Sequence, residues 1–250
     1  MKTSVVVLAG GVNVIPLYPG YKPGYKALLE YHGKKSIEYV LDALAKAKNV
    51  GKIIIIGAKE LKPYVKRYPL LESKGTHTPD ITMALDYFKN EKEVLFTSSD
   101  IPLIKPDAFD EFIARSRKVN ADIKMAIVHK KDDPYNATKA FNPSGNDSWA
   151  HGNLVMVKTD FPREKLKLME SFYGVRKQGP LSIAKVVGLQ FLLFYLFKAV
   201  LTHTATVEDI AARVSARFSV KLAPVHCTHV ESALDVDDPP DYELAKRVLG

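Results

Sequence analysis

The segment Ser4–Ala9 constrains the fold more than any other part of the chain, because it is an almost unbroken apolar run that ends at Gly10 and Gly11. A short run rich in β-branched residues and without alternating polar positions is typical of a strand buried on both faces. Strands of this kind occur in parallel sheets that helices cover on both sides. The sequence therefore predicts an α/β domain whose first strand ends in a glycine loop.

The remaining sequence alternates predicted strands and helices, which favours a right-handed, mostly parallel sheet with ligands at the carboxyl ends of its strands. Ser36 is placed to cap the first predicted helix. Predicted helices cover about 36–48, 81–89 and 106–118, a last helix begins at Pro240, and predicted strands cover 52–57, 93–97, 123–129, 154–158, 220–227 and 233–236. The length fits a single domain over residues 1–250.

A mostly helical stretch from about 161 to 218 is predicted to be an insertion in this domain. It contains the apolar segment Val186–Leu201, followed by a helix that Thr206 caps with Asp209 three residues later. The apolar segment is shorter than the roughly 20 residues that cross a bilayer, and lysines bracket its uncharged part. We expect it to be buried by the insertion or by a second copy of the chain; an interfacial membrane helix is the alternative.

The formal net charge of +8 suits a polyanionic ligand. Basic residues are spread along the chain without a helix-turn-helix, zinc-finger or aromatic RNA-binding signature, which argues against a nucleic-acid partner. Cys227 is the single cysteine, so an intrachain disulfide and a cysteine metal cluster are excluded. The first residues lack the features of a signal peptide, and a cytoplasmic protein without a membrane span is expected.

Two candidate phosphate-binding features lie in the loop after the first strand. Gly10 and Gly11 let backbone N–H groups approach a ligand closely, because they have no Cβ. The chain has neither G-x-G-x-x-G nor G-x-x-x-x-G-K-[ST], which argues against an ordinary dinucleotide fold and excludes an ordinary P-loop. Lys26 ends the loop, where it could reach back to phosphate oxygens; a solvated loop lysine is the alternative.

Carboxylates follow two of the predicted strands. Asp100 comes after a buried strand and before Pro102, where it could hold a hard cation; an Asx turn or a helix cap is the alternative. Asp235 and Asp237 lie at the end of a later predicted strand, and alternation along an extended chain places them on the same side. With Asp238 they repel one another unless a cation or lysines compensate; a solvated acidic turn is the competing account.

These segments, in this order, resemble the MobA-like NTP transferases, a family of glycosyltransferase-A-like nucleotidyltransferases. The family pattern is a Leu-Ala-Gly-Gly strand end, a loop with a basic residue and then a lysine, Asp-x-Pro-Leu, and a late Asp-x-Asp-x-Pro segment. The matching residues are Leu8, Ala9, Gly10, Gly11, Lys22, Lys26, Asp100–Leu103 and Asp235–Pro239. Gly152 and Asn153 also resemble the strand entry by which some relatives line the acceptor site.

The resemblance implies a three-layer, Rossmann-like α/β fold with a mostly parallel mixed sheet, of the nucleotide-diphospho-sugar transferase type, to which the helical insertion is added. It implies transfer of a nucleoside monophosphate from an NTP, with GTP preferred, to a small phosphorylated or hydroxylated acceptor, with release of pyrophosphate. The implied roles are catalysis by Lys26 and Asp100, Mg²⁺ binding by Asp100, Asp235 and Asp237, nucleotide binding by Leu8, Ala9, Gly10, Gly11, Lys22 and Lys26, and acceptor binding by Gly152 and Asn153.

The loop before Lys26 departs from the family pattern, because it has Lys22-Pro23-Gly24 in place of Arg-x-Gly and carries three tyrosines. A lysine does not form the bidentate phosphate fork of an arginine. Two alternative functions stay open. One is a metal-dependent glycosyltransferase, which binds a nucleotide-sugar and releases no pyrophosphate. The other is a catalytically silent protein that binds a nucleotide or a partner.

Overall fold

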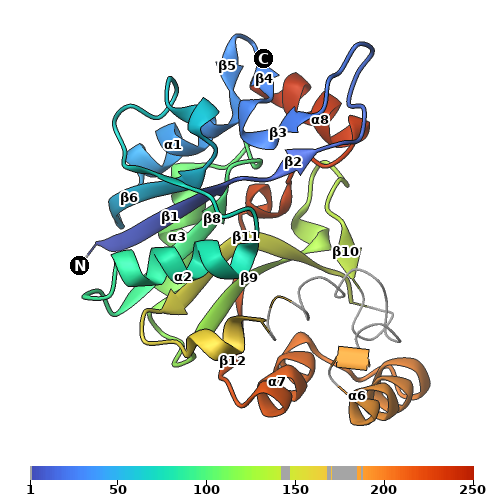
Figure 1. The fold of residues 1–250 in the computed structure, drawn as a ribbon. Coiled ribbons are helices and arrows are strands. Elements are labelled where there is room, and N and C mark those ends of the chain that lie inside the picture. The colour runs from blue at the N-terminus through green and yellow to red at the C-terminus, as the bar shows by residue number, and fades with distance from the viewer. Residues whose placement is uncertain (1, 142–146, 168–169, 171–184, 187) are drawn as a thin grey trace.

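The computed structural model describes residues 2–141, 147–167, 170, 185–186 and 188–250. Its central mixed sheet has the strand order β12-β9-β11-β8-β1-β6-β7, and β10 pairs with β11 (Figure 1). The strands of this sheet are β1 (Thr3–Ala9), β6 (Val50–Gly57), β7 (Leu70–Glu72), β8 (Glu93–Ser98), β9 (Ile123–His129), β10 (Ala140–Phe141), β11 (Trp149–Lys158) and β12 (Leu222–Cys227). Along the order, β11 is antiparallel to both neighbours and the other adjacent pairs are parallel. The predicted mostly parallel mixed sheet is confirmed.

Helices cover both faces of this sheet (Figure 1). The helices α1 (Ser36–Lys46) and α3 (Pro106–Ser116) pack on one face, and α2 (His77–Tyr87), α6 (Leu189–Phe194) and α7 (Val207–Phe218) contribute to the core on the other. Alternation along β1 explains the two cores, because Val5 and Val7 join the first and Val6 the second. All three valines are fully buried. The predicted three-layer α/β architecture is therefore confirmed.

A third apolar cluster lies beyond the sheet and holds the loops that leave it. It joins α8 (Pro239–Leu249) to the hairpin of β4 (Glu30–Tyr31) and β5 (Lys34–Lys35), with Leu103, Leu234 and Val236 among its buried members. A second hairpin, β2 (Val12–Asn13) with β3 (Gly24–Tyr25), lies in the loop after β1. Short 3-10 turns occur at Lys26–Leu28, Lys59–Leu61, Lys130–Asp132 and Val230–Ala233.

Several predicted boundaries are corrected by packing. Ser36 does not cap α1; it is the first helical residue, and its hydroxyl donates a 2.8 Å hydrogen bond to the Ser99 carbonyl at the end of β8. The helix predicted to begin near residue 81 begins at His77, because the Asp80 carboxylate accepts hydrogen bonds from the segment before it. Strand β11 begins five residues earlier than residue 154, because its first part pairs with the end of β9 and with β10.

The apolar segment predicted as one helix over Val186–Leu201 is divided. Gly188 has a φ of +109°, α6 begins at Leu189, and the backbone takes π-helical geometry over Tyr195–Leu201. The Thr206 cap of α7 is confirmed, with Asp209 completing a capping box. Residues 171–184 of the predicted insertion lie outside the described part of the chain, so the insertion as a unit stays a proposal.

The described side chains of α6 and the π-helix include both buried and exposed apolar groups. Phe191 and Phe194 are 3% and 7% exposed, whereas Leu193 and Phe197 are 60% and 61% exposed. The insertion and the sheet thus bury Phe191 and Phe194 but leave Leu193 and Phe197 exposed in a single chain. Coverage of the exposed side chains by a second copy stays a prediction. Across the described residues, every helix is too short or too polar to cross a membrane.

Candidate active site

The site is built where β1 and β8 leave the sheet side by side. Leu8 of β1 and Ser98 of β8 are partners in a parallel ladder, and the Ser99 N–H donates a 3.1 Å hydrogen bond to the Leu8 carbonyl. Gly10 therefore follows one strand next to the point where Asp100 follows the other. Ligands bind at this edge in open parallel sheets, because adjacent loops diverge there.

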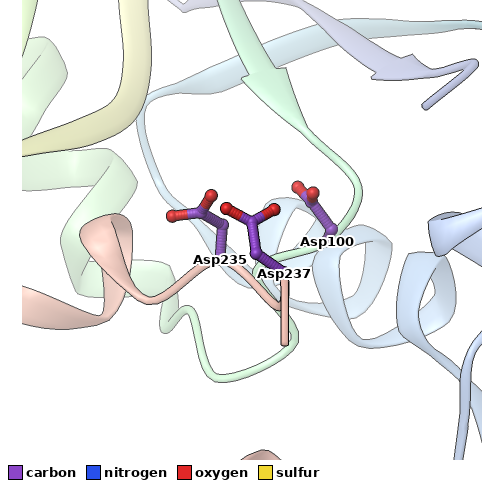
Figure 2. A group of neighbouring side chains, drawn as sticks. All are labelled: Asp100, Asp235 and Asp237. Carbon is purple, nitrogen blue, oxygen red and sulfur yellow. The ribbon is translucent and has the colours of Figure 1, made fainter. Parts of the chain in front are cut away.

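Asp100, Asp235 and Asp237 form a cluster at this edge, and Figure 2 shows their carboxylates side by side. One oxygen of each residue lies within 4.8 Å of those of the other two. The main chain brings the segments together, because the Val236 N–H donates a 2.9 Å hydrogen bond to the Asp100 carbonyl. The two segments thus converge as expected from the sequence, while their role as metal ligands stays a prediction.

The predicted strand over 233–236 is wrong, although its aspartates meet Asp100. A 3-10 turn ends at Ala233, and the next residues run irregularly into α8. Leu234 and Val236 alternate into the apolar cluster around α8, which leaves Asp235 and Asp237 on the other side of the chain. Packing against α8, and not a strand ladder, therefore explains why both aspartates face the site.

Lys26 reaches into this cluster. The main-chain N–H of Lys26 donates a 2.9 Å hydrogen bond to the main-chain carbonyl of Gly11, and this bond closes the loop next to the end of β1. Its ammonium lies 2.9 Å from the Asp100 Oδ2 and also hydrogen-bonds the Asp237 Oδ1. Burial lowers the pKa of Lys26, but the two carboxylates outweigh burial and raise that pKa above its ordinary value. Lys26 is therefore a fixed cation here, not a solvated loop lysine.

Lys139 is a second cation at the site, and the sequence reasoning missed it. Its ammonium lies 2.7 Å from the Asp241 carboxylate and 3.4 Å from those of Asp237 and Asp238. Burial lowers the pKa of Lys139, but its hydrogen bond to Asp241 and the nearby charges raise it overall. Lys139 lies in a loop without a recognisable motif, so only the folded arrangement reveals it.

The sequence reasoning also missed Asn13, which helps to hold the site together. Its side chain is 3% exposed, donates a 3.3 Å hydrogen bond to the Asp237 carbonyl and accepts one from the Ile15 N–H at 2.9 Å. These bonds tie the glycine loop to the segment that carries Asp237. An asparagine four residues after a strand gives a weak sequence signal, because asparagine is common in exposed loops.

Gly152 and Asn153 lie in β11 at the border of the cluster. The Asn153 side chain donates hydrogen bonds to the Ser232 carbonyl at 3.2 Å and to Asp235 at 3.4 Å. A Cβ on Gly152 would lie only 2.8 Å from the Ala126 Cβ. Close packing against β9 thus explains the glycine at position 152 without any acceptor. Acceptor binding stays a prediction for both residues.

Lys22 lies in the loop that leads to Lys26. It is exposed and lines a cavity of about 820 Å³ between its loop and α8, together with Tyr18, Tyr21 and Tyr242. Among the described residues, the ion pairs of the aspartate cluster are made by Lys26 and Lys139 and not by Lys22. A contact between Lys22 and a triphosphate therefore stays a prediction.

The charges of the site suit a hard cation. The site has the ammonium groups of Lys26 and Lys139 and five carboxylates, and together these groups carry a formal charge of −3. The carboxylates are those of Asp100, Asp235, Asp237, Asp238 and Asp241. Hard cations such as Mg²⁺ bind carboxylate and phosphate oxygens, and the Asp100 side chain is only 13% exposed. The donor set therefore fits a divalent cation.

The fold and this site define a nucleotidyltransferase-type α/β protein. The chain belongs to the MobA-like NTP transferase domain family, whose sequence model matches residues 5–144. None of the curated proteins compared with the chain matches it. The matched range contains the glycine loop, Lys26 and Asp100, whereas Asp235 and Asp237 lie beyond it.

Solved structures agree with this assignment. A hypothetical transferase from Thermus thermophilus is 26% identical with a TM-score of 0.76, over 97% of this chain and 100% of that one. A CMP:2-keto-3-deoxy-manno-octonic acid synthetase complexed with CTP is 13% identical with a TM-score of 0.61, over 100% and 98%. A nucleotidyl transferase from Methanothermobacter thermautotrophicus is 15% identical with a TM-score of 0.58, over 99% and 97%. The last two likenesses show the fold alone.

Proposed function

We propose that the protein transfers a nucleoside monophosphate from an NTP to a small phosphorylated or hydroxylated acceptor, with release of pyrophosphate and with Mg²⁺ as cofactor. The observation that carries this proposal is the meeting of Lys26 with Asp100 and Asp237 beside the glycine loop. Reactions at phosphorus need mainly positioning and charge stabilisation, so these groups suffice without a histidine or cysteine nucleophile.

Each part of the site has a role in this proposal. Backbone N–H groups of Gly10 and Gly11 face the triphosphate, and the Lys26 ammonium offsets its negative charge. Asp100, Asp235 and Asp237 would hold Mg²⁺, which when bound neutralises triphosphate oxygens and the developing charge on pyrophosphate. The acceptor lies towards Gly152 and Asn153, and its oxygen attacks the α-phosphorus in line with the departing pyrophosphate.

A thermal-shift panel tests nucleotide binding before the acceptor is known. Each NTP is added with and without Mg²⁺, because a ligand that binds only the folded state raises the unfolding temperature. One NTP, with GTP favoured by family resemblance, should stabilise the protein more with Mg²⁺ than without. Stabilisation by nucleotide-sugars but by no NTP would favour a glycosyltransferase, and no stabilisation by any nucleotide would contradict the proposal.

A further inference from the structure

The Lys26 ammonium lies between two of the three candidate metal ligands. It is 2.9 Å from the Asp100 Oδ2 and hydrogen-bonded to the Asp237 Oδ1, and its side chain is 17% exposed. These two carboxylates belong to the cluster whose oxygens lie within 4.8 Å of one another. The protein thus places a cation of its own among the carboxylates.

Lys26 and a metal ion would compete for the same two oxygens. The ammonium nitrogen bonds one oxygen of each carboxylate, Asp100 Oδ2 and Asp237 Oδ1. Mg²⁺ binds carboxylate oxygens at about 2.0–2.1 Å, which leaves no room for an ammonium group bonded to the same two atoms. A divalent cation that bound these two oxygens would therefore have to displace Lys26.

We propose that Lys26 neutralises Asp100 and Asp237 until a divalent cation enters together with a polyphosphate. Phosphate oxygens offer the ammonium new charge-assisted hydrogen bonds, which compensate for those lost at Asp100 and Asp237. Asp100 and Asp237, with Asp235, would then hold the metal. This inference rests on the proposed function and adds to it an order of binding for the nucleotide and the metal. Free metal binds poorly until the nucleotide draws Lys26 away from the carboxylates.

Lys139 differs from Lys26 in position, which makes it a matched control. Its shortest carboxylate contact, at 2.7 Å, is to Asp241, which lies outside the metal-ligand set. It bonds Asp237 through Oδ2, while Lys26 bonds Oδ1 of the same residue. Removal of Lys139 therefore changes the charge near the cluster without vacating the place between Asp100 and Asp237.

The test measures Mn²⁺ binding by electron paramagnetic resonance in the absence of nucleotide. Lys26→Met should bind Mn²⁺ about ten- to a hundredfold more tightly than the wild type, the range expected when charged hydrogen bonds no longer have to be displaced. Lys26→Arg keeps a cation in place and should resemble the wild type. Lys139→Met should gain clearly less than Lys26→Met.

A second substitution shows which carboxylate the more tightly bound Mn²⁺ uses. In Lys26→Met combined with Asp100→Asn, the tighter Mn²⁺ binding should be lost, because one of the two vacated ligands is removed. Thermal unfolding is measured in parallel, and Mn²⁺ should stabilise Lys26→Met more than the wild type. Lys26→Gln, which keeps a polar side chain, replaces Lys26→Met if the latter does not fold.

Two results would overturn the inference: Mn²⁺ binding by Lys26→Met that is unchanged or weaker, or a gain equal to that of Lys139→Met, which would reflect net charge alone. Pyrophosphate release by the wild type tests the proposed function separately. A wild type that turns over NTP, with a Lys26→Met variant that gains no Mn²⁺ affinity, would contradict only the inference. A gain in Mn²⁺ affinity without turnover by the wild type would contradict only the function.

Discussion

The main-chain N–H of Val236 lies 2.9 Å from the main-chain carbonyl of Asp100, and this bond joins two segments more than 130 residues apart in the sequence. It holds the Asp235–Asp237 segment against the turn after β8 without using any carboxylate. The acidic side chains can therefore be replaced while the main-chain framework of the site is kept.

The first prediction follows because a main-chain bond, and not the carboxylates, holds these two segments together. Asp100→Asn should lower nucleotidyl transfer by about ten- to a hundredfold, because one charge-assisted contact is worth about 1.5–3 kcal/mol and the amide lacks the negative charge that attracts Mg²⁺. Its unfolding free energy should change by less than about 1 kcal/mol, since the bond to Val236 remains. Asp107→Asn, an exposed change in the first turn of α3, is the control. A fully active Asp100→Asn variant would exclude Asp100 from the chemistry.

The second prediction concerns Gly152, where β11 passes close to β9. Gly152→Ala should cost about 1–3 kcal/mol of unfolding free energy, because the new methyl group would lie 2.8 Å from the Ala126 Cβ. Gly24→Ala is the matched control, since the nearest atom to its added Cβ is 3.8 Å away. Denaturant titrations measure both. Equal stabilities of the two variants would show that the strands separate without cost.

The third prediction is a pH dependence of stability. Burial raises the pKa of Asp133, but hydrogen bonds from Thr138, Tyr135 and Ala137 lower it overall. A folded-state pKa below the unfolded value contributes stability that is present above the unfolded value and lost as the pH falls through the folded one. The wild type should therefore lose stability below about pH 4, given an unfolded Asp pKa of about 3.9.

The variant Asp133→Asn isolates this contribution. At pH 7 it should be less stable by about 1–2 kcal/mol, because an amide is a weaker acceptor than a carboxylate for three backbone N–H groups. The difference from the wild type should shrink as the pH is lowered. Asp132→Asn, at an exposed neighbouring position, should match the wild type throughout. A constant difference from pH 7 to pH 2 would contradict the assignment.

The central strands and the convergence of the aspartates could be predicted because both depend on local patterns. Strands buried on both faces, such as β1 and β6, are continuous apolar runs, and parallel strands end at one edge of the sheet. Asp100 and the Asp235–Asp237 segment could thus be placed together before their contacts were known.

Other features depend on packing between distant segments. Leu234 and Val236 alternate like a strand, but they pack on α8, and no local pattern separates these outcomes. Lys139 and Asn13 come from loops whose course is set by tertiary contacts. The exposure of Leu193 and Phe197 was unforeseen because the apolar sequence around them does not reveal which side chains meet the core.

The most direct test of the account follows label and pyrophosphate together. The wild type and Asp100→Asn are incubated with Mg²⁺, each α-³²P-labelled NTP and a panel of phosphorylated or hydroxylated small molecules. We predict that the wild type transfers label from one NTP to an acceptor and releases one pyrophosphate for each label transferred. Asp100→Asn should do both at least about tenfold more slowly, and a reaction without Mg²⁺ should do neither. Label transfer without pyrophosphate, or nucleotide binding without turnover on any acceptor, would contradict the account.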